Sequence, residues 1–113
     1  MKQMQKDTER KIAQLQLIEQ NLQNALLQKQ RFQSELFEIE NALKEIDNAE
    51  EVYKIVGNIM LSKKKEDLKK ELVSKKGVID IRIKNLEREE SKIREKANTL
   101  QKEVIGEIEN DRR

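Results

Sequence analysis

The sequence predicts an all-α-dominated fold: a long antiparallel two-helix coiled coil with a short β-hairpin at the connection. Two apolar seams with heptad spacing flank a central stretch, which contains two short apolar runs around a glycine, and the 113 residues include no proline to interrupt a helix. Because only 35% of the residues are hydrophobic and 41% are charged, we expect a thin core, two helices wide. One domain is expected over residues 1–113.

The first helix is expected over residues 7–46. Starting at Leu15, alternating steps of three and four residues along the chain reach ten positions that form a seam. Nine of these ten residues are apolar, and Lys29 is the exception. This spacing keeps one stripe of a helix facing a partner helix. The ten positions are Leu15, Ile18, Leu22, Ala25, Lys29, Phe32, Leu36, Ile39, Leu43 and Ile46.

A β-hairpin is expected over residues 52–62. The runs 52–56 and 59–62 are rich in β-branched and apolar residues, and Gly57-Asn58 between them suits a type II′ or type I′ turn, because both turns need positive φ. The hairpin is apolar on both faces and alone would be only marginally stable in water. Its edges and faces are therefore expected to contact other chains.

The second helix is expected over residues 63–109, with Ser62 as a candidate N-cap. Its seam has the same spacing as the first, and eight of its ten positions are apolar. The ten are Leu72, Lys76, Ile79, Ile83, Leu86, Glu90, Ile93, Ala97, Leu100 and Val104.

Folding the chain about Gly57-Asn58 brings together positions whose numbers sum to about 115, so that Phe32 faces Ile83. This register lays the acidic segment 35–51 beside the lysine-rich segment 63–76. Opposite charges that flank a seam favour one pairing of the helices. The lysine run is therefore interpreted first as part of the coiled coil, and a nucleic-acid patch is the less favoured alternative.

The same register places Lys29 within one helical turn of Glu90 across the seam. We predict that these two residues form an ion pair at the centre of the coiled coil. The alternative is that each side chain reaches water independently.

Composition and spacing argue against several function classes. Without cysteine or histidine the chain has no disulfides, no Cys/His zinc site and no imidazole acid–base chemistry. The three glycines form no phosphate-binding loop, and the carboxylates are expected on solvated faces, so neither an enzyme nor a cofactor is expected. The net charge of +2 gives no strong attraction to nucleic acid. No apolar run approaches the roughly 20 residues that span a bilayer, and no signal peptide is expected.

Apolar residues outside the seams, together with Val104 at the last position of the second seam, fall into two groups. The first lies at the open end of the hairpin of helices and contains Met1, Met4, Ile12, Leu17, Val104, Ile105 and Ile108. The second lies toward the β-hairpin and contains Phe37, Leu68, Val73, Val78 and Ile81. This distribution indicates a protein that assembles at one end and binds other proteins at the other. The simpler alternatives are frayed helix ends and a plain dimer.

Three stretches resemble the prefoldin β subunit, most closely the archaeal type. Residues 22–32 read LQNALLQKQRF, residues 52–61 read VYKIVGNIML, and residues 64–72 read KKEDLKKEL. The single β-hairpin points to the β rather than the α class of subunit. The resemblance covers about residues 10 to 105.

The resemblance implies a cytoplasmic, ATP-independent holdase. It implies a hexamer of two α and four β subunits, whose β-hairpins pool into β-barrels and whose coiled-coil tips hold non-native proteins and transfer them to a group II chaperonin. The open-end group named above supplies the candidate client contacts. The expected assembly residues are Val52, Tyr53, Ile55, Val56, Gly57, Asn58, Ile59, Met60 and Leu61. The alternative function is a coiled-coil scaffold or tether that binds a folded partner.

Overall fold

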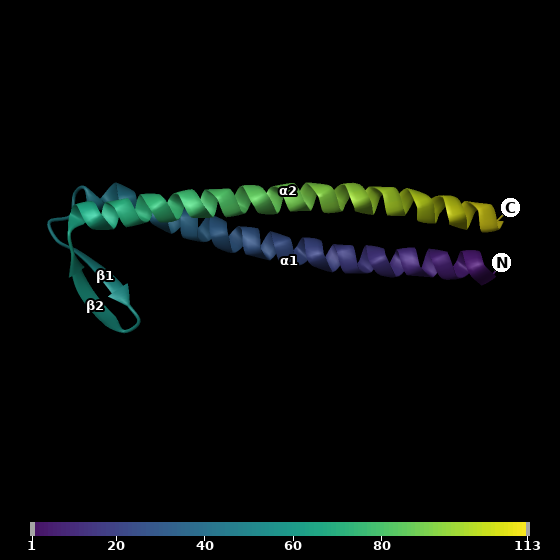
Figure 1. The fold of residues 1–113 in the computed structure, drawn as a ribbon, viewed down its shortest axis with the longest axis horizontal. Helices are drawn as coiled ribbons and strands as arrows, with labels where there is room; N and C mark the ends of the chain where they lie inside the picture. Colours follow the sequence, from purple (N-terminus) through teal and green to yellow (C-terminus); the bar gives the residue numbers. More distant parts are fainter. Residues whose placement is uncertain (1, 113) are drawn as a thin grey trace. The chain divides into compact units, whose positions relative to one another are not determined.

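Two long helices are joined by a two-stranded antiparallel sheet (Figure 1). The structure is a computed structural model that describes residues 2–112 and the side chains of residues 5–112. Helix α1 spans Lys2–Ile46, strand β1 Val52–Val56, strand β2 Ile59–Lys63 and helix α2 Lys65–Arg112. The predicted fold class is therefore confirmed at the level of its elements. Helix α1 begins before residue 7, and α2 continues past residue 109.

The start of α2 differs from the expected one. Ser62 is not an N-cap, because it belongs to β2 and pairs with Tyr53 in the strand ladder. The helix begins at Lys65, and the Leu68 amide donates to the Lys64 carbonyl at 3.0 Å. Glu66 and Asp67 lie in the first turn, where negative charge interacts favourably with the helix dipole.

The chain divides into two units, and each is described by itself. The terminal unit comprises Met1–Gln28 and Asn85–Arg113, and the hairpin unit comprises Lys29–Lys84. In both units every position of the two predicted seams is buried or half-buried, Lys29 and Glu90 included. The apolar stripes therefore face a neighbouring helix, as the heptad spacing predicts.

The core of the hairpin unit is a cluster of three isoleucines. Ile39, Ile79 and Ile83 are 6%, 2% and 9% exposed. Partly buried apolar side chains from both helices pack against this cluster, namely Phe32, Leu36, Leu43 and Leu72. Their numbers agree with the predicted pairing of positions that sum to about 115.

Charged side chains flank this core with the predicted polarity. Glu40 of α1 lies 3.6 Å from Lys76 of α2. After α1 ends, the Asp47 carboxylate pairs with Lys69 at 3.0 Å, and the Asp47 carbonyl accepts a hydrogen bond of 2.9 Å from Lys65. The acidic and lysine-rich segments therefore do lie side by side.

The β-hairpin has the predicted register, from Val52 opposite Lys63 to Val56 opposite Ile59. Gly57 has a φ of 62°, and no described residue other than glycine has positive φ. A type I′ turn requires positive φ at both central residues, and Asn58, the second of them, does not have it. The turn is therefore of type II′.

In the terminal unit the described parts of α1 and α2 pair along their length (Figure 1). The Thr8 hydroxyl donates to Glu107 at 2.5 Å, and Lys11 pairs with both Glu107 and Glu103, the latter at 3.3 Å. These contacts hold the same register as the seam. Within residues 2–112, neither helix contains a segment long and apolar enough to cross a membrane.

Candidate functional site

The features of the described residues that could contact another molecule lie on the surface of the protein. Across residues 2–112, no group of three or more acidic, histidine or cysteine side chains is arranged to hold a metal ion. The features that remain are exposed apolar side chains on the β-hairpin, exposed apolar side chains in the terminal unit, and a groove between the helices of the terminal unit.

The β-hairpin presents an unusually apolar surface to solvent. The predicted assembly residues include seven large apolar side chains, and among these seven only Val52 is half-buried. The others and their exposed fractions are Tyr53 49%, Ile55 67%, Val56 52%, Ile59 63%, Met60 64% and Leu61 46%. Contiguous exposed apolar surface of this kind marks a protein interface. The hairpin is therefore the candidate assembly surface.

Ion pairs hold the hairpin against the start of α2. Lys54 of β1 pairs with Glu71 of α2 at 3.0 Å, and Lys63 of β2 lies 3.8 Å from the same carboxylate. The hydrogen bond from Lys54, together with the charges of both lysines, lowers the pKa of Glu71 below its usual value. The two strands are thus positioned by charges on their polar residues, which leaves their apolar side chains free for other chains.

A hollow of about 240 Å³ lies where the hairpin meets the helices. It is lined by Val52 and Tyr53 of β1 together with Ile46 of α1 and Leu72 of α2. The Tyr53 hydroxyl donates a short hydrogen bond to Glu51, which raises the pKa of Tyr53.

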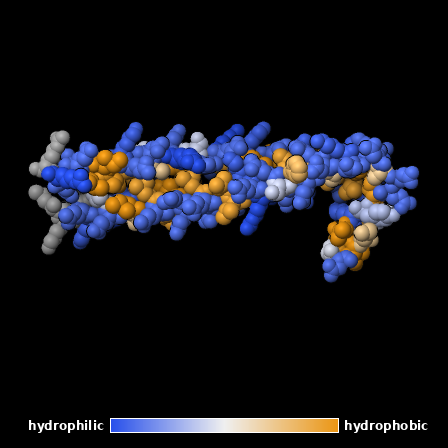
Figure 2. Space-filling view, turned by 180° about the vertical axis from the view of Figure 1, so that it is seen from behind, coloured by the Kyte–Doolittle hydropathy of each residue, from blue (hydrophilic) through white to orange (hydrophobic). Residues whose placement is uncertain are grey.

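Four of the predicted client contacts are exposed apolar side chains of the terminal unit. Ile12, Leu17, Ile105 and Ile108 are 39%, 58%, 57% and 39% exposed. On the face drawn in Figure 2, apolar surface gathers over this unit and over the hairpin. Met1 lies outside the described residues, and so does the side chain of Met4.

Val104 requires a correction. It is 8% exposed, because it occupies a seam position of α2 and points into the helix interface. A side chain buried in this way is a core residue of the terminal unit, so Val104 is removed from the candidate client contacts.

The predicted Lys29–Glu90 pair stays a prediction, because the two residues belong to different units. Within its own helix Glu90 accepts a hydrogen bond of 2.8 Å from Arg94, one turn further along α2. The Glu90 side chain is only 17% exposed, as expected for a seam position.

The terminal unit contains a polar cluster that was not anticipated from the sequence. Its members are Thr8, Lys11, Glu103 and Glu107. Hydrogen bonds from Lys11 and then Thr8 lower the pKa of Glu107, and the hydrogen bond to Glu107 raises the pKa of Lys11. Each shift favours the charged form of the group. The cluster therefore joins α1 to α2 beside Val104 through charged, partly exposed side chains.

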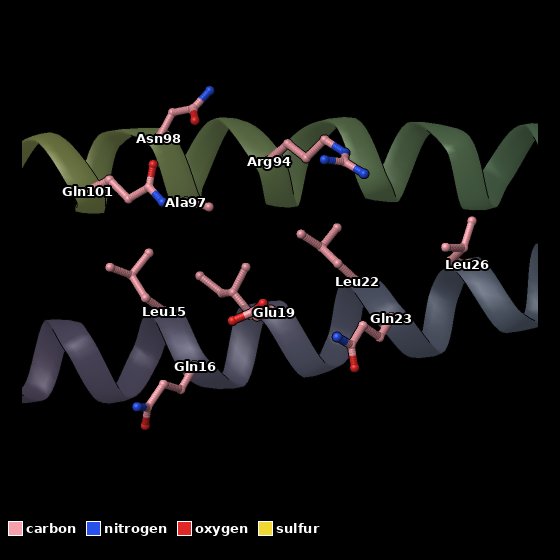
Figure 3. A pocket seen from close by; sticks show the side chains of 11 residues that line it. Leu15, Gln16, Glu19, Leu22, Gln23, Leu26, Arg94, Ala97, Asn98 and Gln101 are labelled. Atoms are coloured by element: carbon pink, nitrogen blue, oxygen red, sulfur yellow. The ribbon is translucent and has the colours of Figure 1, made fainter.

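The groove in the terminal unit was also missed by the sequence reasoning. It has a volume of about 580 Å³. Leu15 and Leu22 point from α1 toward α2, and Ala97 lies on the side of α2 that faces α1 (Figure 3). Because Ala97 is a small residue at a seam position, the two helices leave space above the apolar floor. The groove is lined by Leu15, Gln16, Ile18, Glu19, Leu22, Gln23, Leu26, Arg94, Ala97, Asn98 and Gln101.

Paired helices that carry an uncovered apolar β-hairpin define a coiled-coil subunit of a larger protein assembly. The model of the family described as "Prefoldin subunit" matches residues 9–110. The chain therefore belongs to the prefoldin subunit family, and the relatives reported below place it with the archaeal β subunits.

Two curated relatives illustrate the similarity. The chain is 46% identical to a prefoldin subunit beta from Archaeoglobus fulgidus over 80% of this chain and 82% of the relative. It is 36% identical to one from Thermococcus onnurineus over 82% of this chain and 83% of the relative.

A solved structure shows the same fold. The crystal structure of the prefoldin beta subunit from Thermococcus strain KS-1 matches with a TM-score of 0.78 and 34% identity, covering 87% of this chain and 89% of that one. The resemblance read from the three sequence stretches is confirmed, and with it the role of a chaperone subunit that assembles with other prefoldin subunits.

Proposed function

We propose that the chain is an ATP-independent holdase subunit that binds non-native proteins through the terminal unit and passes them to a group II chaperonin in the cytoplasm. It acts by binding alone, without catalysis. The observation that carries the proposal is the set of exposed apolar side chains in the terminal unit, of which Leu17 and Ile105 are more than half exposed. Non-native proteins expose apolar surface of their own, and contact between the two removes both from water.

The β-hairpin supplies the assembly contacts in this proposal. Its exposed apolar residues pool with those of other hairpins into a β-barrel, in a hexamer of two α and four β subunits. Pairing in a barrel satisfies the strand edges that a two-stranded sheet leaves open. Assembly also places several terminal units around one client, and this multivalency strengthens binding that is weak at each unit.

The test uses the full chain assembled with its α-class partner and a chemically denatured client whose aggregation is followed by light scattering. Leu17→Gln combined with Ile105→Gln replaces exposed apolar side chains by polar ones that favour a helix. Suppression of aggregation is expected to fall. The matched control is Val78→Gln combined with Ile81→Gln, at residues 47% and 60% exposed in the hairpin unit, which is expected to retain suppression.

Equal suppression by both double variants would refute client binding at these terminal residues. Saturable binding to one folded protein, with no protection of unrelated denatured proteins, would support the scaffold function instead. The mass of each assembly shows whether a change in aggregation suppression arises from weaker client binding or from dissociation of subunits.

A further inference from the structure

Met60 is the only sulfur-containing residue whose side chain the structure describes. The chain has three methionines and no cysteine. Met1 lies outside the described residues, and so does the side chain of Met4. Met60 belongs to β2 and is 64% exposed. Because thiols are absent, the methionine thioethers are the side chains of this protein that a peroxide oxidises most readily.

The strand register places Met60 on the face of the hairpin that is turned away from α2. Met60 is directly opposite Ile55, which is 67% exposed. Successive residues of a strand point to opposite faces, so Lys54 and Lys63 lie on the other face, where both pair with Glu71 of α2. The Met60 thioether is therefore open to solvent in the unassembled subunit, and it lies on the predicted assembly surface.

We propose that the Met60 thioether of the free subunit is a site of oxidation by hydrogen peroxide, and that the resulting sulfoxide prevents the hairpin from joining other subunits. The inference rests on the assembly role of the hairpin proposed above and adds a redox control to it. Subunits that are already assembled are protected, because the assembly covers the same surface.

The reaction transfers one oxygen atom. A lone pair of the Met60 sulfur attacks one oxygen of hydrogen peroxide, so that an S–O bond forms as the O–O bond breaks. The departing hydroxide takes the proton of the transferred oxygen and leaves as water. The sulfur loses two electrons and the peroxide gains them. Sulfoxide reductases reverse the change, with two thiols forming a disulfide and the oxygen leaving as water.

Oxidation replaces an apolar group of the assembly surface by a polar one. The new oxygen is a hydrogen-bond acceptor, whereas Ile55, directly opposite, carries no side-chain donor. The Tyr53 hydroxyl on the same face already donates to Glu51. Moving such an oxygen from water into an apolar interface is unfavourable. Each β subunit of the proposed assembly supplies one such hairpin, so the loss recurs at every β subunit.

The first experiment locates the oxidation. The full chain, either free or assembled with its α-class partner, is treated with hydrogen peroxide and digested with trypsin. Cleavage after Lys54 and Lys63 releases the peptide of residues 55–63, in which Met60 is the only methionine. Mass spectrometry follows the gain of one oxygen by this peptide. Met60 is expected to be oxidised at least about fivefold faster in the free chain than in the assembly, because the reaction depends on exposure.

The second experiment measures the effect on assembly. The treated chain is mixed with its α-class partner, and the mass of the products is recorded. The oxidised wild type is expected to assemble at least about tenfold more weakly than the untreated chain. Met60→Leu keeps an apolar side chain of similar size without sulfur, so peroxide is expected to change its assembly by less than about twofold. The matched control, Met4→Leu, retains Met60 and is expected to stay sensitive.

Sulfoxide reductases for both epimers, supplied with a thiol, are expected to restore assembly of the oxidised wild type. This measurement decides the matter if Met60→Leu fails to assemble before treatment, since absence of recovery overturns the inference. The inference is also overturned if Met60 is oxidised no faster in the free chain than in the assembly. Equal assembly of oxidised and untreated chains, or equal sensitivity of Met60→Leu and the wild type, has the same consequence.

Ile55→Gln separates this inference from the proposed assembly role, because it places a polar side chain opposite Met60 without any oxidation. If Ile55→Gln assembles like the wild type, the assembly role of the hairpin is itself refuted. If Ile55→Gln weakens assembly and oxidation of Met60 does not, the assembly role stands and only the redox control is refuted.

Discussion

The core of the hairpin unit allows a quantitative prediction, based on Ile79. This side chain is 2% exposed and belongs to the cluster with Ile39 and Ile83. Replacement by alanine removes the burial of three carbon atoms and leaves a cavity unless the helices move closer. Such substitutions cost about 2 to 5 kcal/mol in globular cores. A seam only two helices wide closes more easily than a globular core, which places the expected loss at about 2 to 3 kcal/mol.

Ile81 provides the matched control, because it is two positions away on the same helix and 60% exposed. Ile81→Ala removes little buried surface and gains slightly in helix propensity, so the expected change lies within about 0.5 kcal/mol. The isolated subunit is unfolded with urea and followed by circular dichroism at a single protein concentration, since association alone changes apparent stability.

The expected difference between Ile79→Ala and Ile81→Ala is at least about 1.5 kcal/mol, so the ratio of their unfolding constants is about tenfold or more, from 1.4 kcal/mol for each factor of ten. Equal loss of stability in the two variants would refute the assignment of Ile79 to the core. A large loss confined to Ile81→Ala would show that the register of the two helices is shifted.

Three further predictions concern the polar cluster, the turn and the flanking charges. The pKa of Glu107 in the folded state is lowered from 4.5. Its contribution to stability is therefore present above that value and is lost as the pH falls through the lowered pKa. The variant Glu107→Gln should remove this part of the acid dependence of thermal unfolding. Lys11 has a pKa raised above 10.5, so its contribution is present below that value and is lost as the pH rises through the raised pKa. Gly57→Ala forces a residue with a Cβ into positive φ and should destabilise the hairpin by about 1 kcal/mol, seen as weaker assembly with the α-class partner in mass measurements. Glu40→Lys should cost about 0.2 to 1 kcal/mol in urea unfolding, and adding Lys76→Glu should restore most of it by reversing the pair.

Each of these has an outcome that contradicts it. An unchanged acid dependence in Glu107→Gln would show that the cluster contributes nothing to stability. Gly57→Asn is the control for the turn, because asparagine tolerates positive φ better than alanine, and it should assemble more tightly than Gly57→Ala. If the double charge reversal is no more stable than Glu40→Lys alone, these residues do not interact across the seam.

The helices and their register were predictable because they depend on spacing. A heptad pattern maintained over many turns identifies the buried stripe without knowledge of the partner, and all twenty seam positions are indeed buried or half-buried. The turn at Gly57-Asn58 then determines which positions meet, because a two-residue turn leaves one antiparallel register. The facing acidic and lysine-rich segments follow from that register.

The candidate site was less predictable, because it depends on what each side chain meets in space. Val104 satisfied both the seam and the open-end pattern in the sequence, and the structure assigns it to the seam by burial. Ser62 resembled an N-cap, but the strand pairing includes Ser62 and continues to Lys63. The groove had a signal in the sequence, the stretch 12–28 in which Glu19 is the only charged residue, and a search for apolar residues alone does not detect it.

By itself, the sequence determined the helix–hairpin–helix order, the two seams, the pairing of positions that sum to about 115 and the resemblance to prefoldin β subunits. These properties follow from periodicity and from one turn, which are local features of the chain. Only the tertiary structure decided the type II′ turn, the burial of Val104, the cluster around Lys11 and Glu107, and the groove beside Ala97. The turn type is set by the backbone angles at Gly57 and Asn58, which the sequence left open between two possibilities. The other three depend on the packing of side chains from distant parts of the sequence, and no local pattern fixes how closely two facing helices approach.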